Sequence, residues 1–134
     1  MDFDWLRRAC LALPGAYEDY PFGPETATFR VRIPERIAGP GAGKVFAFAG
    51  VDAVPPSVSL KCEPALVIPL RAAHPEITGA WHLDKKHWNG VRLDGALTAA
   101  TVADLIEDSY DLVVASLPAA HRRALGWSGG DSPS

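Results

Sequence analysis

The chain has few of the residues that hold together small secreted scaffolds or span membranes. It contains only two cysteines, Cys10 and Cys62, and both lie in apolar surroundings in separate predicted elements. Free, packed thiols in a reducing compartment fit this pattern better than a disulfide framework. No stretch approaches the roughly 18 apolar residues of a membrane span, and residues 1–4 are acidic rather than basic. We therefore expect a soluble cytoplasmic protein without a membrane partner.

A strong net charge is missing as well. The formal net charge is −3, which argues against salt-driven binding of nucleic acid by the molecule as a whole. Residues 1–25 carry two basic and five acidic side chains, residues 26–97 carry nine and six, and residues 98–134 carry two and five. The positive charge is therefore concentrated in the middle of the chain. The ordinary scatter of charges on a solvated surface explains a difference of this size equally well.

Motifs for metals, phosphates and catalysis are also absent. There is no CxxC or HExxH pattern, and the glycines near position 40 precede a predicted strand rather than a helix. His82 and His87 have no cysteine near them in the sequence, and no nucleophile and base can be paired from the sequence. We therefore expect no metal, no cofactor and no catalytic residues. An enzyme built around His82 or His87 is kept as a third hypothesis.

What the chain does have is enough apolar residues for one core. It is 134 residues long and 48% hydrophobic, which is typical of a single globular domain that folds without disulfides or metals. We place this domain at residues 1–125. The remaining residues, 126–134, are rich in serine and glycine and predict a flexible tail. A monomer is the favoured oligomeric state.

Helices are predicted near both ends of the chain. Apolar residues recur with helical spacing in residues 3–13, where Asp2 precedes them as N-cap and Pro14 ends the run. A longer helix begins after Thr98, with a second possible start at Thr101. Its predicted inner side consists of Val102, Leu105, Ile106, Val113 and Leu117. Tyr110 is predicted to be a core residue with one hydrogen bond.

Three segments alternate apolar and polar residues as half-buried strands do: residues 28–33, 44–49 and 57–62. Because they follow one another, they predict an antiparallel meander with a long hairpin tip between the first two strands. The side chains predicted to share the exposed face of the first strand are Thr28, Arg30 and Arg32. Residues 16–24, before the meander, are interpreted as a connection.

A further helix and strand are predicted after the meander. The helix opens at Glu63-Pro64, because proline is favoured at the first helical position, and Pro75 ends it. Its predicted inner face consists of Leu66, Leu70 and Ala73. Residues 90–95 predict a short strand closed by a turn.

Residues 81–89 have the most unusual composition, with two tryptophans, two histidines and two lysines. In one interpretation, Lys85, Lys86 and Arg92 neutralise phosphates while Trp81 or Trp88 stacks on bases. In the other, one tryptophan packs on the core and the lysines are simply solvated. The two interpretations are compatible, because a turn held by a buried tryptophan is also a rigid platform for lysines.

A family resemblance is carried by five segments, residues 44–47, 60–64, 70–71, 79–89 and 109–114. With these segments the chain resembles the MmcQ/YjbR family of small bacterial proteins, from the first helix to about Arg123. The resemblance implies a fold similar to that of CyaY and DNA binding by two loop-bearing hairpins in a double-wing arrangement. Two departures stand out: Asp84 occupies a position where the family usually has asparagine, and the first hairpin carries extra residues.

We therefore predict an α+β fold, a twisted antiparallel sheet packed against the N- and C-terminal helices. The leading functional hypothesis is a non-catalytic protein that binds double-stranded DNA. Its predicted nucleic-acid-binding residues are Lys85, Lys86, His87, Trp88, Arg92, Arg30, Arg32 and Lys44. The alternative is a module that binds a small anionic ligand or a protein partner in a concave pocket beside Trp81 and His87. The residues assigned to this alternative surface are Trp81, His82 and Lys61.

Overall fold

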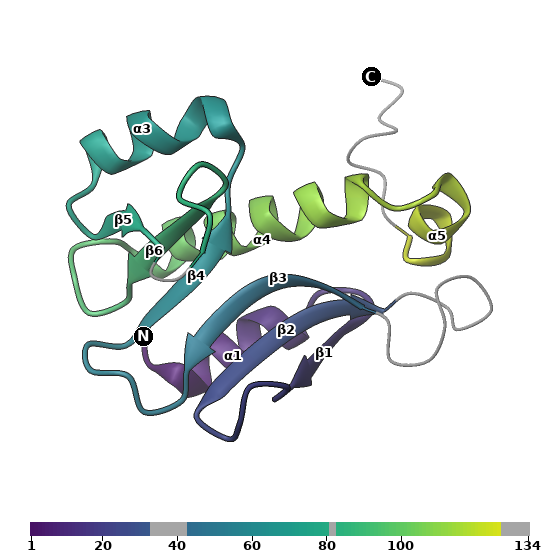
Figure 1. Cartoon of the computed structure of the whole chain (residues 1–134), viewed down its shortest axis with the longest axis horizontal. Coiled ribbons are helices and arrows are strands. Elements are labelled where there is room, and N and C mark those ends of the chain that lie inside the picture. Colours follow the sequence, from purple (N-terminus) through teal and green to yellow (C-terminus); the bar gives the residue numbers. More distant parts are fainter. Residues whose placement is uncertain (33–42, 81–82, 127–134) are drawn as a thin grey trace.

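Six antiparallel strands form one sheet in the order β1-β2-β3-β4-β6-β5 (Figure 1). The strands are β1 (Ala16–Asp19), β2 (Thr26–Arg32), β3 (Gly43–Gly50), β4 (Ser57–Lys61), β5 (Ile77–Gly79) and β6 (Trp88–Arg92). The structure is a computed structural model that describes residues 1–32, 43–80 and 83–126. Most of the predicted hairpin tip, Trp81, His82 and most of the predicted tail therefore lie outside the described residues.

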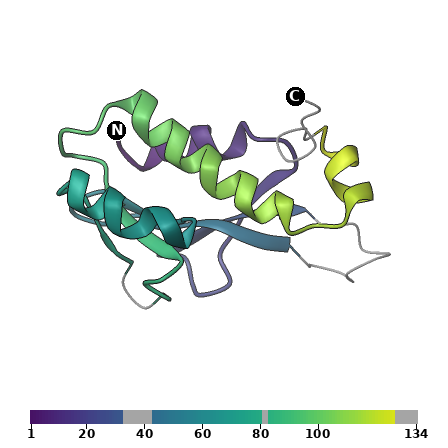
Figure 2. The same ribbon diagram turned by 90° about the horizontal axis from the view of Figure 1, so that it is seen from above.

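Two helices cover one face of the sheet. α1 (Phe3–Leu11) and α4 (Ala99–Ala115) contact each other on this face, as Figure 2 shows. α3 (Pro64–Ala73) lies at the β5–β6 end, and the short α5 (Ala119–Ala124) follows α4. Among the described residues no helix covers the other face, which we call the open face. The predicted α+β fold is confirmed.

The first and last predicted helices begin where the sequence indicates. Asp2 Oδ1 accepts a hydrogen bond of 2.9 Å from the Trp5 amide, and Thr98 Oγ1 accepts one of 3.1 Å from the Thr101 amide. These caps satisfy amides that have no partner inside the helix. Four of the five residues predicted for the inner side of α4 are buried, and Leu105 is half-buried.

The predicted meander is confirmed as β2, β3 and β4, which pair in sequence. On β2 the alternate residues Ala27, Phe29 and Val31 are completely buried against the helices. β1 and β5 were not predicted: β1 falls in the segment interpreted as a connection. Both strands are short, so their extended conformation depends on pairing with β2 and β6 rather than on a local pattern.

A β-bulge at Phe46 changes which face the start of β3 presents. Phe29 pairs with Ala47, but the next residue, Arg30, pairs with Val45, so Phe46 is the extra residue. Lys44 is therefore opposite Val31, on the side of the sheet that the helices cover. Its Nζ lies 3.0 Å from Ser116 Oγ at the end of α4.

The buried face of α3 differs from the prediction. Val67 is the buried residue of this helix, whereas Leu66 is 48% exposed and Ala73 is exposed. Leu70 is half-buried. The predicted inner face is therefore wrong for Leu66 and Ala73, whereas Leu70 packs against the core as predicted. The reason is that α3 packs at the margin of the sheet and buries only a narrow strip.

Ser109 of α4 joins two strands that separate near the bulge. β3 and β4 pair directly at only two positions, ending at Ala47 and Leu60. Beyond this point Ser109 Oγ donates to the Phe46 carbonyl (2.6 Å) and accepts from the Lys61 amide (2.8 Å). A side chain on α4 thus completes the ladder of hydrogen bonds between the strands.

The neighbouring Tyr110 is buried, as predicted. Its hydroxyl donates to the Pro14 carbonyl (2.5 Å), and its ring meets Phe46 edge-on with the centroids 5.5 Å apart. These two contacts tie α4 to the segment after α1 and to the sheet.

Candidate functional site

A row of three aromatic side chains crosses the open face. The Phe48 ring on β3 lies 5.4 Å from the Trp88 ring on β6 and 6.4 Å from the Phe22 ring, measured between centroids. Phe48 pairs with Thr28, and Trp88 pairs with Lys61, so strand register directs these side chains away from the helices. Phe22 is 70% exposed. The row is therefore an aromatic surface that is accessible from solvent at its Phe22 end.

Two loops project from the open face, one between β1 and β2 and the other between β5 and β6 (Figure 2). The first loop carries Phe22, and the described part of the second carries Leu83. Between them lies a hollow of about 560 Å³. Small side chains contribute to it together with the aromatic ones. The lining residues are Phe22, Thr26, Phe48, Ala49, Gly50, Ser57, Ser59 and Leu83.

Asp84 stabilises the second loop, between β5 and β6, through hydrogen bonds within the loop. Its Oδ1 accepts a hydrogen bond from the Lys86 amide (2.9 Å), and its Oδ2 lies 2.5 Å from His87 Nδ1. Its carbonyl accepts from the amides of His87 (3.1 Å) and Trp88 (2.9 Å). The hydrogen bonds from His87 and then from the Lys86 amide lower the pKa of the Asp84 carboxyl. Asp84 is thus a turn-forming residue whose charge is directed toward His87.

Arg71 of α3 holds the same loop from the side of the sheet. Its Nε donates to Asn89 Oδ1 (2.8 Å), and its guanidinium also donates to the carbonyls of Lys85 (2.5 Å) and Trp88 (3.3 Å). Asn89 is only 2% exposed. The planar guanidinium can make several such bonds at once because its donors are fixed in one plane. Sequence analysis did not assign Arg71 to the site, although residues 70–71 are part of the family resemblance.

The loop presents its two lysines to solvent. Lys85 and Lys86 are exposed, and neither has an ion-pair partner among the described residues. The Lys85 stem passes over Gly79, where a Cβ atom would lie only 2.9 Å from Lys85 Cδ. Glycine at position 79 therefore lets Lys85 lie close to β5. The structure brings Lys85, Lys86, His87 and Trp88 together, as the local sequence requires.

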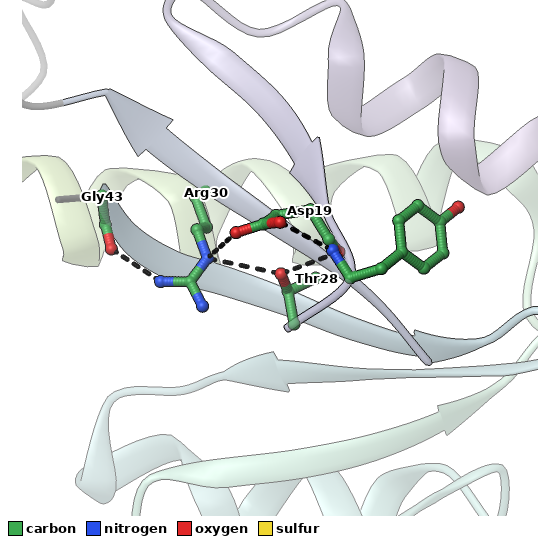
Figure 3. A network of polar contacts seen from close by, with 5 residues as sticks. Asp19, Thr28, Arg30 and Gly43 are labelled. Carbon is green, nitrogen blue, oxygen red and sulfur yellow. Dashed lines mark hydrogen bonds and ion pairs between the residues drawn. The ribbon is translucent and has the colours of Figure 1, made fainter. Parts of the chain in front are cut away.

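Two of the predicted arginines are engaged in contacts within the protein. Arg92 Nε lies 3.1 Å from Asp94 Oδ1. Figure 3 shows Arg30, whose guanidinium donates to the Gly43 carbonyl (3.0 Å) and to Thr28 Oγ1 (3.4 Å) and lies 3.6 Å from Asp19 Oδ2. Thr28 lies on the same face of β2 as Arg30, as predicted, but it is completely buried rather than exposed.

The other predicted cations have different surroundings. The Arg32 guanidinium lies over the Tyr17 ring, 4.7 Å from its centroid. Lys61 is half-buried, and strand register places it beside Trp88 on the open face. Lys44 lies on the helix-covered side, so the structure does not bring it together with Lys85 and Lys86. The predicted residues Trp81 and His82 fall outside the described residues.

The cysteines and histidines do not form a metal site in the described part of the chain, where no three His, Cys, Asp or Glu side chains gather. Both cysteines are free. Burial raises the pKa of the Cys10 thiol to about 12, and burial together with the Asp108 carboxylate raises the pKa of the Cys62 thiol. Both thiols therefore stay protonated at neutral pH.

The sequence model of the YjbR family matches residues 11–112, which include the sheet, both loops and most of α4. The chain belongs to the YjbR family. A similar relative is YbdF of Escherichia coli, 32% identical over 111 residues that cover 83% of each chain. YjbR of Escherichia coli is 40% identical over 70 residues, which cover 52% of this chain and 59% of that protein.

Solved structures of related proteins share the fold. Protein DR2400 of Deinococcus radiodurans, described as having a DUF419 domain, superposes with a TM-score of 0.83 at 35% identity, covering 94% of this chain and 88% of that one. A protein from Pseudomonas syringae gives a TM-score of 0.68 at 28% identity, covering 84% and 99%. None of the helices in the described residues of this YjbR-family protein is long and apolar enough to cross a membrane.

Proposed function

We propose that this YjbR-family protein is a cytoplasmic, non-catalytic DNA-binding protein that uses the open face of its sheet. The observation that carries the proposal is the pair of exposed lysines, Lys85 and Lys86, on a loop that Arg71 and Asp84 hold in place beside the aromatic row. Lysines attract phosphates electrostatically, and a fixed loop reduces the conformational entropy that binding would otherwise remove. The loop is therefore suited to contacts with the DNA backbone.

The engaged arginines limit how strong this binding can be. Arg30 and Arg92 would have to exchange their carboxylate partners, Asp19 and Asp94, for phosphates. Lys85 and Lys86 need no such exchange, and Lys61 and Arg32 add charge to the same face. We therefore expect about two to four phosphate contacts. For duplex DNA this corresponds to a slope of about −2 to −4 in log Kobs against log salt.

The aromatic row adds a contact that does not depend on charge. Phe22 exposes most of its ring, and aromatic side chains on a sheet stack with unpaired bases. We therefore expect a single strand to gain stacking that an intact duplex lacks. Its salt slope should be shallower for the same number of phosphate contacts, at about −0.7 per contact instead of −0.9.

The test is a titration of fluorescently labelled duplex and single-stranded DNA of one sequence, followed by anisotropy at low and at near-physiological salt. Changing Lys85 and Lys86 together to Ala should reduce the slope by about 1.8 on the duplex. The matched control changes Arg8 and Arg123 to Ala, because both are exposed on helices and their loss alters net charge equally. Affinity that does not change with salt, or an equal effect of both double variants, would contradict the proposal.

The hollow between the two loops supports a second candidate function, a module that binds a small ligand instead of DNA. A planar ring could contact Phe22 and Phe48, while Ser57 and Ser59 offer hydroxyl groups. This candidate predicts no DNA affinity at near-physiological salt. In the same titration, Phe22→Ala should leave the lysine-dependent slope unchanged if DNA is the ligand. Absence of DNA binding at low salt would favour the second candidate.

A further inference from the structure

A second cavity, of about 210 Å³, lies on the helix-covered side of the sheet between α3, α4, β4 and β6. Most of its lining is apolar, including Leu66 and Leu70 of α3, Leu105 and Leu112 of α4, and Val91 of β6. It exists because α3 buries only Val67 against the rest of the domain. An engineered apolar cavity of about 150 Å³ is large enough to bind benzene. This cavity is larger, so it has room for a ring with a short substituent.

Asn89 supplies one polar group within this apolar lining. It projects from β6 toward the helices and is only 2% exposed. Its Oδ1 accepts the hydrogen bond from Arg71 Nε, which fixes the orientation of the amide and leaves its Nδ2 as a donor. No described residue accepts a hydrogen bond from this nitrogen. Nδ2 is not among the described polar atoms that are both shut off from solvent and unpartnered, and Asn89 lines the cavity, so a ligand oxygen there can replace water as the acceptor of this donor.

The charged residues that line the cavity have the opposite sign to those on the open face. Asp108 of α4 and Glu63, which precedes α3, both line it and are both exposed. Burial and the neighbouring carboxylates of Asp111 and Asp104 raise the pKa of Asp108, as expected where negative charge is concentrated. Lys61 also lines the cavity, but strand register places its side chain on the open face with Trp88. An anionic ligand would therefore meet repulsion from Asp108 and Glu63, which the guanidinium of Arg71 beside Asn89 offsets only in part.

We propose that this cavity binds a small uncharged molecule with a ring-sized apolar body and an oxygen that accepts a hydrogen bond from Asn89 Nδ2. The apolar walls select the body of the ligand, the amide of Asn89 selects the oxygen, and the carboxylates disfavour anions. The proposal does not depend on DNA binding, because the cavity lies on the helix-covered side of the sheet and the proposed DNA contacts lie on the open face.

Three probes of similar size separate these contributions: acetophenone has a carbonyl oxygen, ethylbenzene has none, and benzoate is an anion. Binding is followed in NMR spectra through the side-chain amide signals of Asn89 and the methyl signals of Leu105 and Leu112. We expect acetophenone to bind about tenfold more tightly than ethylbenzene, which is the contribution of one hydrogen bond. Benzoate should bind more weakly than acetophenone, because Asp108 and Glu63 repel its carboxylate.

Two variants test the two parts of the site. Asn89→Asp keeps an acceptor for Arg71 and removes the donor, so acetophenone should lose its advantage over ethylbenzene. Leu66→Trp places a large side chain at the half-exposed edge of the cavity and should weaken both probes. Ile68→Trp is the matched control, because Ile68 lies on the same helix, is 66% exposed and does not line the cavity.

Cys62 provides a second readout, because it also lines the cavity. Saturating acetophenone should slow its alkylation by N-ethylmaleimide, while the fully buried Cys10 stays unreactive in the folded protein. The proposal is overturned if acetophenone shifts none of these signals up to its solubility limit. It is equally overturned if acetophenone and ethylbenzene bind alike to the natural protein, or if Leu66→Trp and Ile68→Trp have the same effect.

Discussion

Arg71→Ala is the substitution that tests most directly how the second loop is held. Arg71 makes three hydrogen bonds, to Asn89 Oδ1 and to the carbonyls of Lys85 and Trp88. Removing it leaves Asn89, which is 2% exposed, with a buried oxygen that has no partner. It also removes the hydrogen bonds between α3 and this loop, all of which Arg71 makes among the described residues.

The size of the effect follows from these bonds. A hydrogen bond to a charged group contributes about 1.5–3 kcal/mol when it is well formed. Arg71 is half-buried, one of its bonds is long, and water can replace it at the exposed loop carbonyls. We therefore assign the full contribution to the bond with Asn89 and a small contribution to the two bonds with carbonyls. The free energy of unfolding should then fall by about 2–3 kcal/mol. A domain with a stability of about 5–15 kcal/mol would stay folded.

The assay is urea unfolding followed by circular dichroism, together with amide hydrogen exchange. We expect faster exchange at the Cys62 amide, which bonds to the His87 carbonyl, and at the Trp88 amide, which bonds to Asp84. Arg71→Lys should be intermediate, because a lysine cannot reproduce the planar set of donors. Arg92→Ala is the control, since its solvent-exposed pair with Asp94 contributes little to stability. Equal stability of Arg71→Ala and Arg92→Ala, with unchanged loop exchange, would refute this account.

Three further predictions concern other parts of the molecule. Ser109→Ala leaves the Phe46 carbonyl and the Lys61 amide without their partner, so the free energy of unfolding should fall by about 2–4 kcal/mol. A loss under about 1 kcal/mol would show that β3 and β4 stay together at this point without the hydroxyl. His121 is 3% exposed, and neither ring nitrogen has a hydrogen-bond partner among the described residues. His121→Leu should therefore keep or raise the melting temperature. A clear decrease would show that the ring makes a hydrogen bond in the folded protein. The lowered pKa of the Asp84 carboxyl stabilises the loop above the unfolded value of 3.8, and this stabilisation is lost as pH falls through the folded value. The protection of the Lys86 amide, which is its exchange rate compared with that of an unstructured amide at the same pH, should therefore fall at acid pH, and Asp84→Ala should abolish that acid step.

Much of the candidate site could be predicted because its parts are neighbours in the sequence. Lys85, Lys86, His87 and Trp88 are consecutive, so any turn that exposes this segment presents them together. The contribution of Asp84 could not be assigned in advance, because a carboxylate beside lysines is equally compatible with repelling a phosphate and with capping a turn. The structure shows the capping bond to Lys86. Whether the lysines bind DNA stays a prediction.

Other parts of the site depend on contacts between distant residues. Arg71 and Asn89 are 18 positions apart, and Phe22 reaches Phe48 only because the β1–β2 loop folds over the sheet. The placement of Lys44 depends on one extra residue at Phe46, since a shift of one position moves a side chain to the other face of a strand. No periodicity in the sequence predicts that bulge.

The sequence by itself determined the elements whose signals are local. Caps at Asp2 and Thr98, helical spacing and strand alternation involve residues two to four positions apart, so they can be recognised without knowing the topology. Tertiary structure alone decided the short strands β1 and β5, the buried face of α3, and the bridge that Ser109 makes between β3 and β4. These features form only after distant segments have come together, because their stability comes from partners elsewhere in the chain.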